Sequence, residues 1–333
     1  MSRPDYNEIK EKFAAFVSTW KIRDTDLLNN IVDPEVACYM SIAKDYPCGS
    51  QHTVFGVKDF VRDIPKSDVL HSRICNYICR IANEEAQQSA HVICMAVKLE
   101  KNKEPDIKTY EFTAMFSNHW RKSADGWVMD EIRMDVLGHG GNFEEFTKDW
   151  YFERPDVVYY AGIHYPCING ELDSPWTRIP EAEDILSDKE QIIEAFACYA
   201  FGIDNLAFNH VDKVLTEDAM FIGPPFNALS KRGWIEAMKF RRQKDRNWTH
   251  PGKPGRLVTD DYTAHLTMYR MSGHRQRKHP YVYTKENIDI EHACARYELD
   301  YRKENGVWKI CKGVYYLGII ELGEYMDDLY GDV

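Results

Sequence analysis

The sequence predicts two α+β domains in tandem, each with N-terminal helices followed by antiparallel strands. The first observation is a repeat: the helix, helix and strand plan of residues 187–222 already occurs in residues 5–40, with matched positions such as Phe16 and Tyr199 lying 183 residues apart. The second is the order of elements in each copy, helices before meandering strands, which is typical of α+β domains. Three further pairs of stretches match in the same order: 55–64 with 232–240, 88–97 with 262–271, and 119–127 with 300–308. A period of this length is domain-sized, so we interpret it as a duplicated domain.

The first helix of the second copy begins with a capping box. Ser187 and Glu190 are three residues apart, so the hydroxyl can accept from a first-turn amide while the carboxylate reaches back to the cap. The apolar residues that follow share one helix face at about 100° per residue. They are Ile192, Phe196, Tyr199, Ile203 and Leu206. Tyr199 is therefore expected to point inward.

The first copy repeats this helix with different polar residues. Asp5 and Glu8 are expected to form its capping box. Its apolar face is made of Ile9, Phe13, Phe16 and Trp20. On the offset of 183 residues, Phe16 stands where Tyr199 stands, and Lys21 stands where Asp204 stands.

The remaining elements follow in order. For the first domain, residues 1–137, we expect a helix and a four- or five-stranded antiparallel sheet: strand 36–42, helix 57–64, and strands 72–81, 89–99, 108–120 and 127–136. For the second domain, residues 181–322, we expect a short helical piece around 211–215, strand 219–222 after a turn at Glu217-Asp218, helix 231–243, and strands near 255–259, 262–271, 288–303 and 307–320.

Two segments and the tail lie outside the repeat. The connector 138–180 is rich in aromatic residues, so we expect it to pack across both domains instead of acting as a flexible spacer. Residues 272–286 are an insertion and the one locally basic segment, which we interpret as a polar loop or as a contact for an anionic substrate tail. The acidic tail 323–333 is expected to fray.

The composition excludes several classes of protein. A net charge of −11 with scattered cations argues against nucleic acid or anionic lipid as a partner. Nine cysteines, an odd number, lie mostly in apolar runs, which indicates reduced thiols and a cytoplasmic protein. The N-terminus lacks the apolar core of a signal peptide, and no stretch is long and apolar enough for a membrane span. Without a glycine-rich phosphate loop or a metal-ligand cluster, we expect no cofactor and no metal.

Both copies also end with a Gly-Trp or Gly-x-Trp turn before the last strand, at Gly126 and Gly306. With the helices and strands before it, this pattern resembles the nuclear transport factor two fold in its SnoaL-like branch, through residues 5–136 and 187–320. The resemblance implies two cone-shaped domains, each with helices and a curved sheet around a pocket. Similar proteins include scytalone dehydratase, bile-acid 7α-dehydratase, ketosteroid isomerase, polyketide cyclases and limonene epoxide hydrolase, while other members of the fold only bind.

The resemblance also implies a site in the second copy. Tyr199 and Asp204 are similar to the tyrosine and aspartate of the bile-acid dehydratase type, and His250 occupies the place of its histidine. His250 would then be a general base, Tyr199 an oxyanion donor or general acid, and Asp204 the carboxylate that orients the imidazole. The base aspartate of ketosteroid isomerase would fall at Gly223, so that mechanism is not supported. His265, Asp300 and Tyr269 are further candidates for the pocket.

The structural alternatives remain open for each of these residues. Tyr199 fits a core tyrosine, Asp204 a solvated carboxylate at a helix end, and His250 a surface histidine in a Pro/Gly loop. Because phenylalanine cannot donate a hydrogen bond, we interpret the first copy as degenerate. Its reserve site would be His71, Tyr39 and His119.

Two hypotheses follow from these residues. The chain is a cofactor-independent lyase (dehydratase) or isomerase for an apolar, carbonyl-bearing molecule of the steroid or polyketide type, or a non-catalytic tandem that binds a small ligand or acts as a scaffold. The two copies are expected to form an internal pseudo-dimer. Further homo-oligomers are left open.

Overall fold

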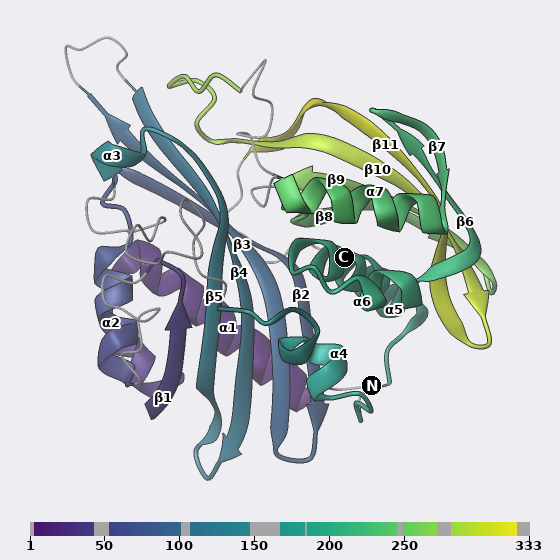
Figure 1. Cartoon of the computed structure of the whole chain (residues 1–333). Coiled ribbons are helices and arrows are strands. Elements are labelled where there is room, and N and C mark those ends of the chain that lie inside the picture. The colour runs from purple at the N-terminus through teal and green to yellow at the C-terminus, as the bar shows by residue number, and fades with distance from the viewer. Residues whose placement is uncertain are drawn as a thin grey trace. The chain divides into compact units, whose positions relative to one another are not determined.

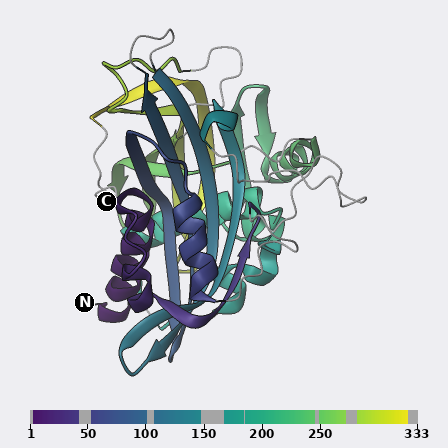
Figure 2. The same cartoon turned by 90° about the vertical axis from the view of Figure 1, so that its left-hand side faces the viewer.

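The computed structural model describes residues 3–42, 53–100, 107–146, 167–183, 185–244, 249–271 and 281–324. The chain divides into two compact units, which are described separately below. One comprises residues 1–136 and 140–184, and the other residues 137–139 and 185–333. Each unit has helices packed on one sheet (Figures 1 and 2), which confirms the prediction of two tandem α+β domains.

The first unit contains a five-stranded sheet in the order β1-β5-β4-β3-β2. Its elements are α1 (Pro4–Ile22), η1 (Leu27–Asn30), β1 (Val32–Met40), α2 (Val54–Asp63), β2 (Val69–Ala82), β3 (Glu85–Leu99), β4 (Ile107–Ser123), β5 (Gly126–Gly141), α3 (Phe143–Phe146), η3 (Gly170–Asp173) and α4 (Pro175–Arg178). The prediction of a purely antiparallel sheet was wrong for its edge, because β1 pairs with β5 in parallel. Parallel pairing needs a long crossover, and the strands between β1 and β5 supply it.

The second unit contains a six-stranded sheet in the order β7-β6-β11-β10-β9-β8. Its elements are α5 (Asp188–Asp204), α6 (Phe208–Lys213), β6 (Leu215–Gly223), β7 (Phe226–Ser230), α7 (Lys231–Lys244), β8 (Gly252–Thr259), β9 (Thr263–Met271), β10 (Ile290–Glu304) and β11 (Val307–Glu324). Here β6 pairs with β11 in parallel, so this sheet is mixed as well. The short strand β7 was not predicted. Glu217 and Asp218 lie within β6 instead of forming a turn, because the strand already begins at Leu215.

The repeat predicted from the sequence is present in the fold. Strand β1 begins and ends 183 residues before β6, and α1 matches α5 to within one residue at each end. If the extra strand β7 is set aside, the two sheets have the same order. Both parallel pairs also share their register, with Val32 opposite Met129 and Leu215 opposite Ile310.

The two first helices begin differently. The capping box at Ser187 and Glu190 is present, as predicted. The one predicted at Asp5 and Glu8 is not, because α1 already begins at Pro4 and both carboxylates lie inside the helix. There, Asp5 accepts hydrogen bonds from Lys122 Nζ at 2.8 Å and from Trp127 Nε1 at 2.9 Å, so it fastens α1 to the hairpin between β4 and β5.

Asp188 makes the equivalent contact in the second unit. It accepts a hydrogen bond from Lys303 Nζ at 2.7 Å, and Lys303 Nζ also stands 5.4 Å from the centre of the Trp308 ring. The contact between an aspartate of the first helix and a lysine of the last hairpin is therefore present in both units.

Aromatic rings fill the space between α1 and its sheet. Phe16 packs edge to face against Trp20 and Phe116, with ring centroids 6.1 and 5.9 Å away. Phe13 also packs on Phe116, at 5.5 Å. These side chains are buried, and no hydroxyl stands at the place of Phe16. The interior of the first unit is therefore apolar where the second unit carries Tyr199.

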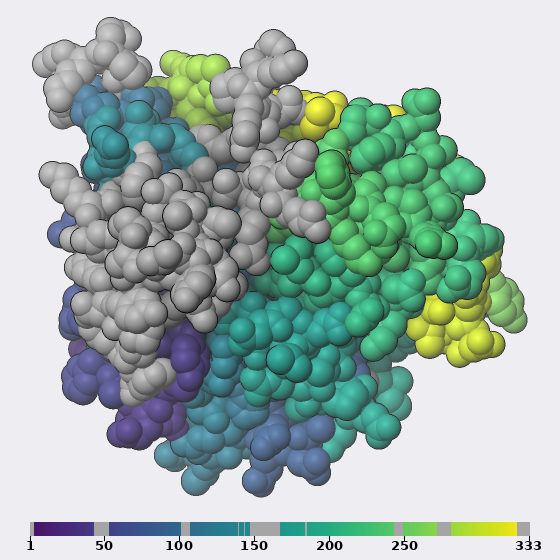
Figure 3. All heavy atoms as spheres, in the orientation of Figure 1, coloured from purple at the N-terminus to yellow at the C-terminus, as the bar shows by residue number. Residues whose placement is uncertain are grey.

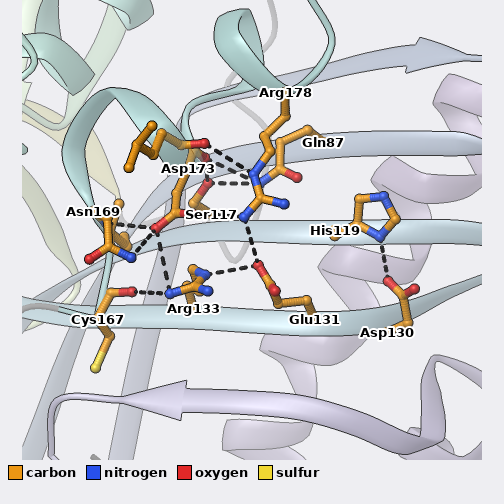
Figure 4. Close-up of polar contacts among 12 residues, drawn as sticks. Gln87, Ser117, His119, Asp130, Glu131, Arg133, Cys167, Asn169, Asp173 and Arg178 are labelled. Carbon is orange, nitrogen blue, oxygen red and sulfur yellow. Dashed lines mark hydrogen bonds and ion pairs between the residues drawn. The ribbon is translucent and has the colours of Figure 1, made fainter.

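Residues 167–180, the last part of the connector, lie on the first unit's sheet and are held by polar contacts (Figure 4). The buried carboxylate of Asp173 accepts a hydrogen bond from Arg178 Nη2 at 2.8 Å. Arg133 Nη1, from β5, donates to the carbonyl of Cys167 at 2.9 Å. Residues 147–166 of the connector, with most of its aromatic side chains, residues 272–280 of the insertion and the tail from 325 lie outside the described residues.

Gly202 provides a test of how closely α5 and α6 approach each other. A Cβ atom at this position would stand 2.7 Å from Val211 Cγ2 and 2.9 Å from the carbonyl of Ala207. In an open helix, Gly→Ala stabilises by about 1 kcal/mol. Here we expect Gly202→Ala to destabilise the protein by about 1–3 kcal/mol through overpacking, measured by urea denaturation. Gly318→Ala is the control, because no atom lies within 4 Å of its Cβ position. Equal stability of Gly202→Ala and the wild type would contradict the close contact.

Candidate functional site

The candidate site lies where the end of α5 meets the residues before β8. Asp204, the last residue of α5, accepts a hydrogen bond on Oδ2 from the backbone N–H of His250 at 2.7 Å. Its Oδ1 lies 2.6 Å from Nδ1 of the His250 ring. Both side chains are shielded from solvent, with exposed fractions of 0% and 3%. The structure thus brings together two of the three predicted residues, and neither is solvated.

Tyr199 lies one helical turn before Asp204, on the inner face of α5, as predicted. Its ring meets the His250 ring edge to face, with centroids 6.2 Å apart. Its hydroxyl accepts a hydrogen bond from Trp234 Nε1 at 3.1 Å, and the ring of Tyr297 lies edge to face with its own, with centroids 6.5 Å apart. Leu206, expected on the same face, instead lies beyond the end of the helix and is exposed.

A stack of aromatic rings holds Tyr199 in place. Phe221, on β6, lies parallel to the Tyr199 ring with centroids 5.9 Å apart. Trp234, on α7, stacks on Phe221 with ring centroids 4.7 Å apart. Because the three rings come from a helix, a strand and a second helix, the orientation of the Tyr199 hydroxyl is fixed by the core of the unit.

Two buried arginines complete the polar group, and the sequence analysis did not identify either of them. Arg270, on β9, donates to the carbonyl of Thr249 through Nε at 2.6 Å and also through Nη2. Arg242, near the end of α7, donates through Nη2 to the carbonyl of Asp204 at 2.8 Å. Arg242 belongs to the run at 241–246 that reads as a solvated helix end, so only the fold reveals its burial.

The electrostatic environment keeps His250 neutral. Burial, the charge of Arg270 and the charge of Arg242 lower the pKa of His250 to about 4, although Asp204 acts in the opposite direction. A carboxylate can only accept hydrogen bonds, so Nδ1 carries the proton and Nε2 is the basic nitrogen. Burial raises the pKa of Tyr199 well above its usual value, so its hydroxyl stays protonated and can donate. The group therefore combines an oriented neutral imidazole with a phenolic donor.

The prediction that His265, Asp300 and Tyr269 contribute to the same pocket was wrong. Alternate residues of a strand point to opposite faces, and the core residues of β9 are Ala264, Leu266 and Met268. His265 and Tyr269 therefore point to the outer face. Asp300, opposite His265 in the register, lies on that face too, and its carboxylate is 2.7 Å from His265 Nδ1.

The reserve site predicted in the first unit is not assembled. His71 on β2 lies opposite Met95 on β3, and Met95 lies opposite Glu111 on β4. His119 lies eight residues further along β4 than Glu111. That separation is about 26 Å at the rise of a strand. His119 binds Asp130 Oδ1 through Nδ1 at 2.6 Å (Figure 4).

The third residue of that set, Tyr39, is also engaged elsewhere. It lies on β1 under the guanidinium of Arg133, which stands 4.5 Å from the centre of its ring. Its strand is separated from β2, which carries His71, by the other three strands of the sheet. Sequence offsets locate equivalent positions in two copies, but they do not show which strand face carries them.

An open groove of about 400 Å³ lies between α6, β6, β7 and α7, on the part of the surface drawn in green in Figure 3. Its walls carry Lys231 with Asp212 and Glu217, at 3.0 and 2.7 Å, so the charges are paired within it. Among the residues that the structure describes, no group of three or more His, Cys, Asp or Glu side chains could hold a metal ion. None of the described helices is long and apolar enough to cross a membrane.

Comparison with known proteins identifies the class of the second unit. Residues 184–313 match the family model of the SnoaL-like domain, so this part of the chain is a SnoaL-like domain. This confirms the resemblance stated from the sequence for the second copy. No curated protein matches the chain.

Solved structures with a similar fold were also found. The Kfla4162 protein from Kribbella flavida is 16% identical, with 41% of this chain and 93% of that chain covered and a TM-score of 0.35. An NTF2-like protein from Cytophaga hutchinsonii is 14% identical, with 40% and 99% covered and a TM-score of 0.29. A scytalone dehydratase-like protein from Novosphingobium aromaticivorans is 9% identical, with 40% and 83% covered and a TM-score of 0.33.

The low pKa of His250 predicts how stability depends on pH. The unfolded state takes up a proton near pH 6.5, whereas the folded state does so only near pH 4. Stability is therefore lost as the pH falls through this window, by about 3 kcal/mol for this group. His250→Asn keeps a donor for Asp204 but does not titrate. Between pH 7 and pH 4, the free energy of unfolding of this variant should therefore fall by about 3 kcal/mol less than that of the wild type.

His265→Asn is the matched control for this prediction. Hydrogen bonds to Asp300 and Glu298 raise the pKa of His265, so its contribution has the opposite sign. It is present below the unfolded pKa and is lost as the pH rises. Denaturation curves at several pH values would measure both effects. The same pH profile for His250→Asn and the wild type would contradict the buried neutral imidazole.

Proposed function

We propose that the second unit is a lyase (dehydratase) or isomerase that works by acid/base chemistry of its own side chains on an apolar, carbonyl-bearing small molecule. The observation that carries this proposal is the buried His250–Asp204 pair beside the Tyr199 hydroxyl. The SnoaL-like family, to which this unit belongs, includes dehydratases and isomerases. The substrate type, steroid-like or polyketide-like, is part of the proposal.

Each residue has a distinct role in the proposed reaction. Nε2 of His250 removes a proton from the carbon next to the carbonyl group, and Asp204 holds the imidazole in the tautomer that leaves this nitrogen basic. The electrons of the C–H bond form an enolate, whose oxygen receives a hydrogen bond from Tyr199. In a dehydration, the enolate then expels a β-hydroxyl group, which leaves as water with a proton from Tyr199 or His250. In an isomerisation, His250 returns the proton to a different carbon.

The first unit supports the second in this proposal. Its helix α1 presents the buried Phe16 in place of Tyr199 and the exposed Lys21 in place of Asp204. Neither side chain can perform the proposed role: the phenyl ring has no donor, and an ammonium group cannot orient an imidazole as a carboxylate does. We therefore propose that the first unit is a degenerate copy, and that the two copies form an internal pseudo-dimer.

One observation favours a second candidate function. The Tyr199 hydroxyl already accepts a hydrogen bond from the buried indole of Trp234, as the hydroxyl of a structural core tyrosine would. A tandem that binds an apolar ligand, or that acts as a scaffold, fits this geometry as well. Binding without proton transfer would distinguish this candidate from the lyase or isomerase.

The burial and the redox state of the cysteines are relevant to the cellular location of the protein. The eight cysteines within the described ranges form no disulfide with one another, and seven of them are buried. Because free buried thiols persist where the medium is reducing, we propose a cytoplasmic location. The proposed partner is an apolar small molecule, and nucleic acid is not part of the proposal.

Deuterium exchange tests the proposed function without knowledge of the natural substrate. β-Tetralone, an apolar ketone, should exchange its α-protons in deuterated water faster with the protein than in buffer, as followed by NMR. His250→Asn should slow the catalysed exchange by about 100-fold or more, because the base is lost. Tyr199→Phe should slow it by about 100–1000-fold, because the enolate oxygen loses its donor.

The controls are side chains of the same type on the surface. His265→Asn and Tyr262→Phe change exposed residues and should leave the exchange rate unchanged. If His250→Asn and Tyr199→Phe together exchange at the wild-type rate, the proposal is wrong. If β-tetralone binds but exchanges only at the buffer rate, the chain is a binding tandem.

A further inference from the structure

The second half of β11 has an open edge. The last residue of β11 that pairs with β6 is Val314, which lies opposite Ile222. β6 ends at the next residue, Gly223, whereas β11 continues to Glu324. From Tyr316 onward, β11 therefore has β10 on one side and no described strand on the other. The backbone N–H and C=O groups along such an edge are a template for a further strand.

The side chains along this edge are those of a strand that pairs. Residues 313–320 include no charged residue and no proline. Tyr316 and Leu317 are 47% and 54% exposed, although both are large. Gly318 has no atom within 4 Å of the position of a Cβ atom, and a glycine inside a strand often marks the close approach of another backbone. This part of β11 is therefore both apolar and open.

The two outer edges of the same sheet are protected against pairing. β8 carries Lys253, Pro254 and Arg256, and proline and charged side chains are the residues that block an edge. β7 spans only Phe226–Ser230, and a short strand offers little edge to a partner. Residues 316–320 of β11 have neither proline nor charge, so this edge differs from the other two.

We infer that a second copy of the chain pairs with this edge, with the two β11 strands antiparallel about a two-fold axis. The charges at the two ends of the stretch favour this arrangement: Lys312 precedes it, and Glu321 and Glu324 end it. Antiparallel pairing brings the acidic end of each strand toward the Lys312 end of the other. Parallel pairing would place like charges side by side, which is destabilising.

The two-fold axis also explains why the pairing would stop at two copies. A two-fold interface uses the same surface on both partners, so the dimer leaves no β11 edge open for a third chain. The inference stands apart from the proposed function, because Tyr199, Asp204 and His250 do not lie on β11.

Mass and amide exchange of the full-length protein test this inference together. Sedimentation equilibrium should give twice the monomer mass at high protein concentration and approach the monomer mass on dilution. In the dimer, the outward-facing backbone amides of residues 316–324 should exchange with deuterium at least about tenfold more slowly than in the monomer, because they donate to the partner strand. Peptides from β8, at the far edge of the sheet, should exchange equally at both concentrations.

A charged substitution on the edge tests the same contact. Leu317→Lys should raise the dissociation constant of the dimer at least about tenfold, because a lysine on an edge strand opposes pairing. Val258→Lys is the matched control, since Val258 is a similarly exposed apolar residue on β8. It should leave the dissociation constant unchanged.

Two results would overturn the inference, and neither depends on whether a variant folds. One is a wild-type protein that stays monomeric at the highest concentration at which it remains in solution, which would leave the edge to a different partner. The other is a dimer in which residues 316–324 exchange as fast as in the monomer, which would place the contact between copies elsewhere.

Discussion

The burial of the Asp204 carboxylate is the constraint that organises the second unit. A charge without solvent must be matched by donors, and both of its oxygens receive them from His250, through the ring and through the backbone. The carbonyl of the same residue receives the Arg242 guanidinium from α7. One residue at the end of α5 thereby fixes α7 and the start of β8, and the orientation of the imidazole follows from that packing.

The two units have the same arrangement of helices and strands but different side chains in their interiors. Both anchor the first helix by an aspartate that binds a lysine of the last hairpin, Asp5 in one unit and Asp188 in the other. In the first unit, α1 buries Phe16 among other aromatic rings. In the second unit, α5 buries the hydroxyl of Tyr199 and, at its end, the carboxylate of Asp204. The arrangement of helices and strands depends on the aspartate–lysine contact and on the strand order, so the side chains that face the interior can differ between the two units.

The success of the sequence analysis depended on how local each signal was. The repeat, the capping box at Ser187 and the inward direction of Tyr199 follow from spacing along the chain, and they were predicted correctly. His265, Asp300 and Tyr269 were misplaced because the face of a strand depends on its neighbours, and a polar residue on β9 reads the same whichever side it faces. Arg242 and Arg270 were overlooked because arginine is rarely buried. No local sequence pattern distinguishes a buried arginine at a helix end or in a strand from an exposed one.

The sequence by itself therefore determined a duplicated α+β chain, the boundaries of most elements and the helix that carries Tyr199 and Asp204, because periodicity and capping are local properties. Only the tertiary structure decided that His250, 46 residues after Asp204, closes on its carboxylate. It also decided that Arg270 lies buried beside that pair, and that the sheets are mixed instead of antiparallel. These features depend on which strands and loops contact one another in the folded chain, and such long-range contacts cannot be inferred from spacing along the sequence.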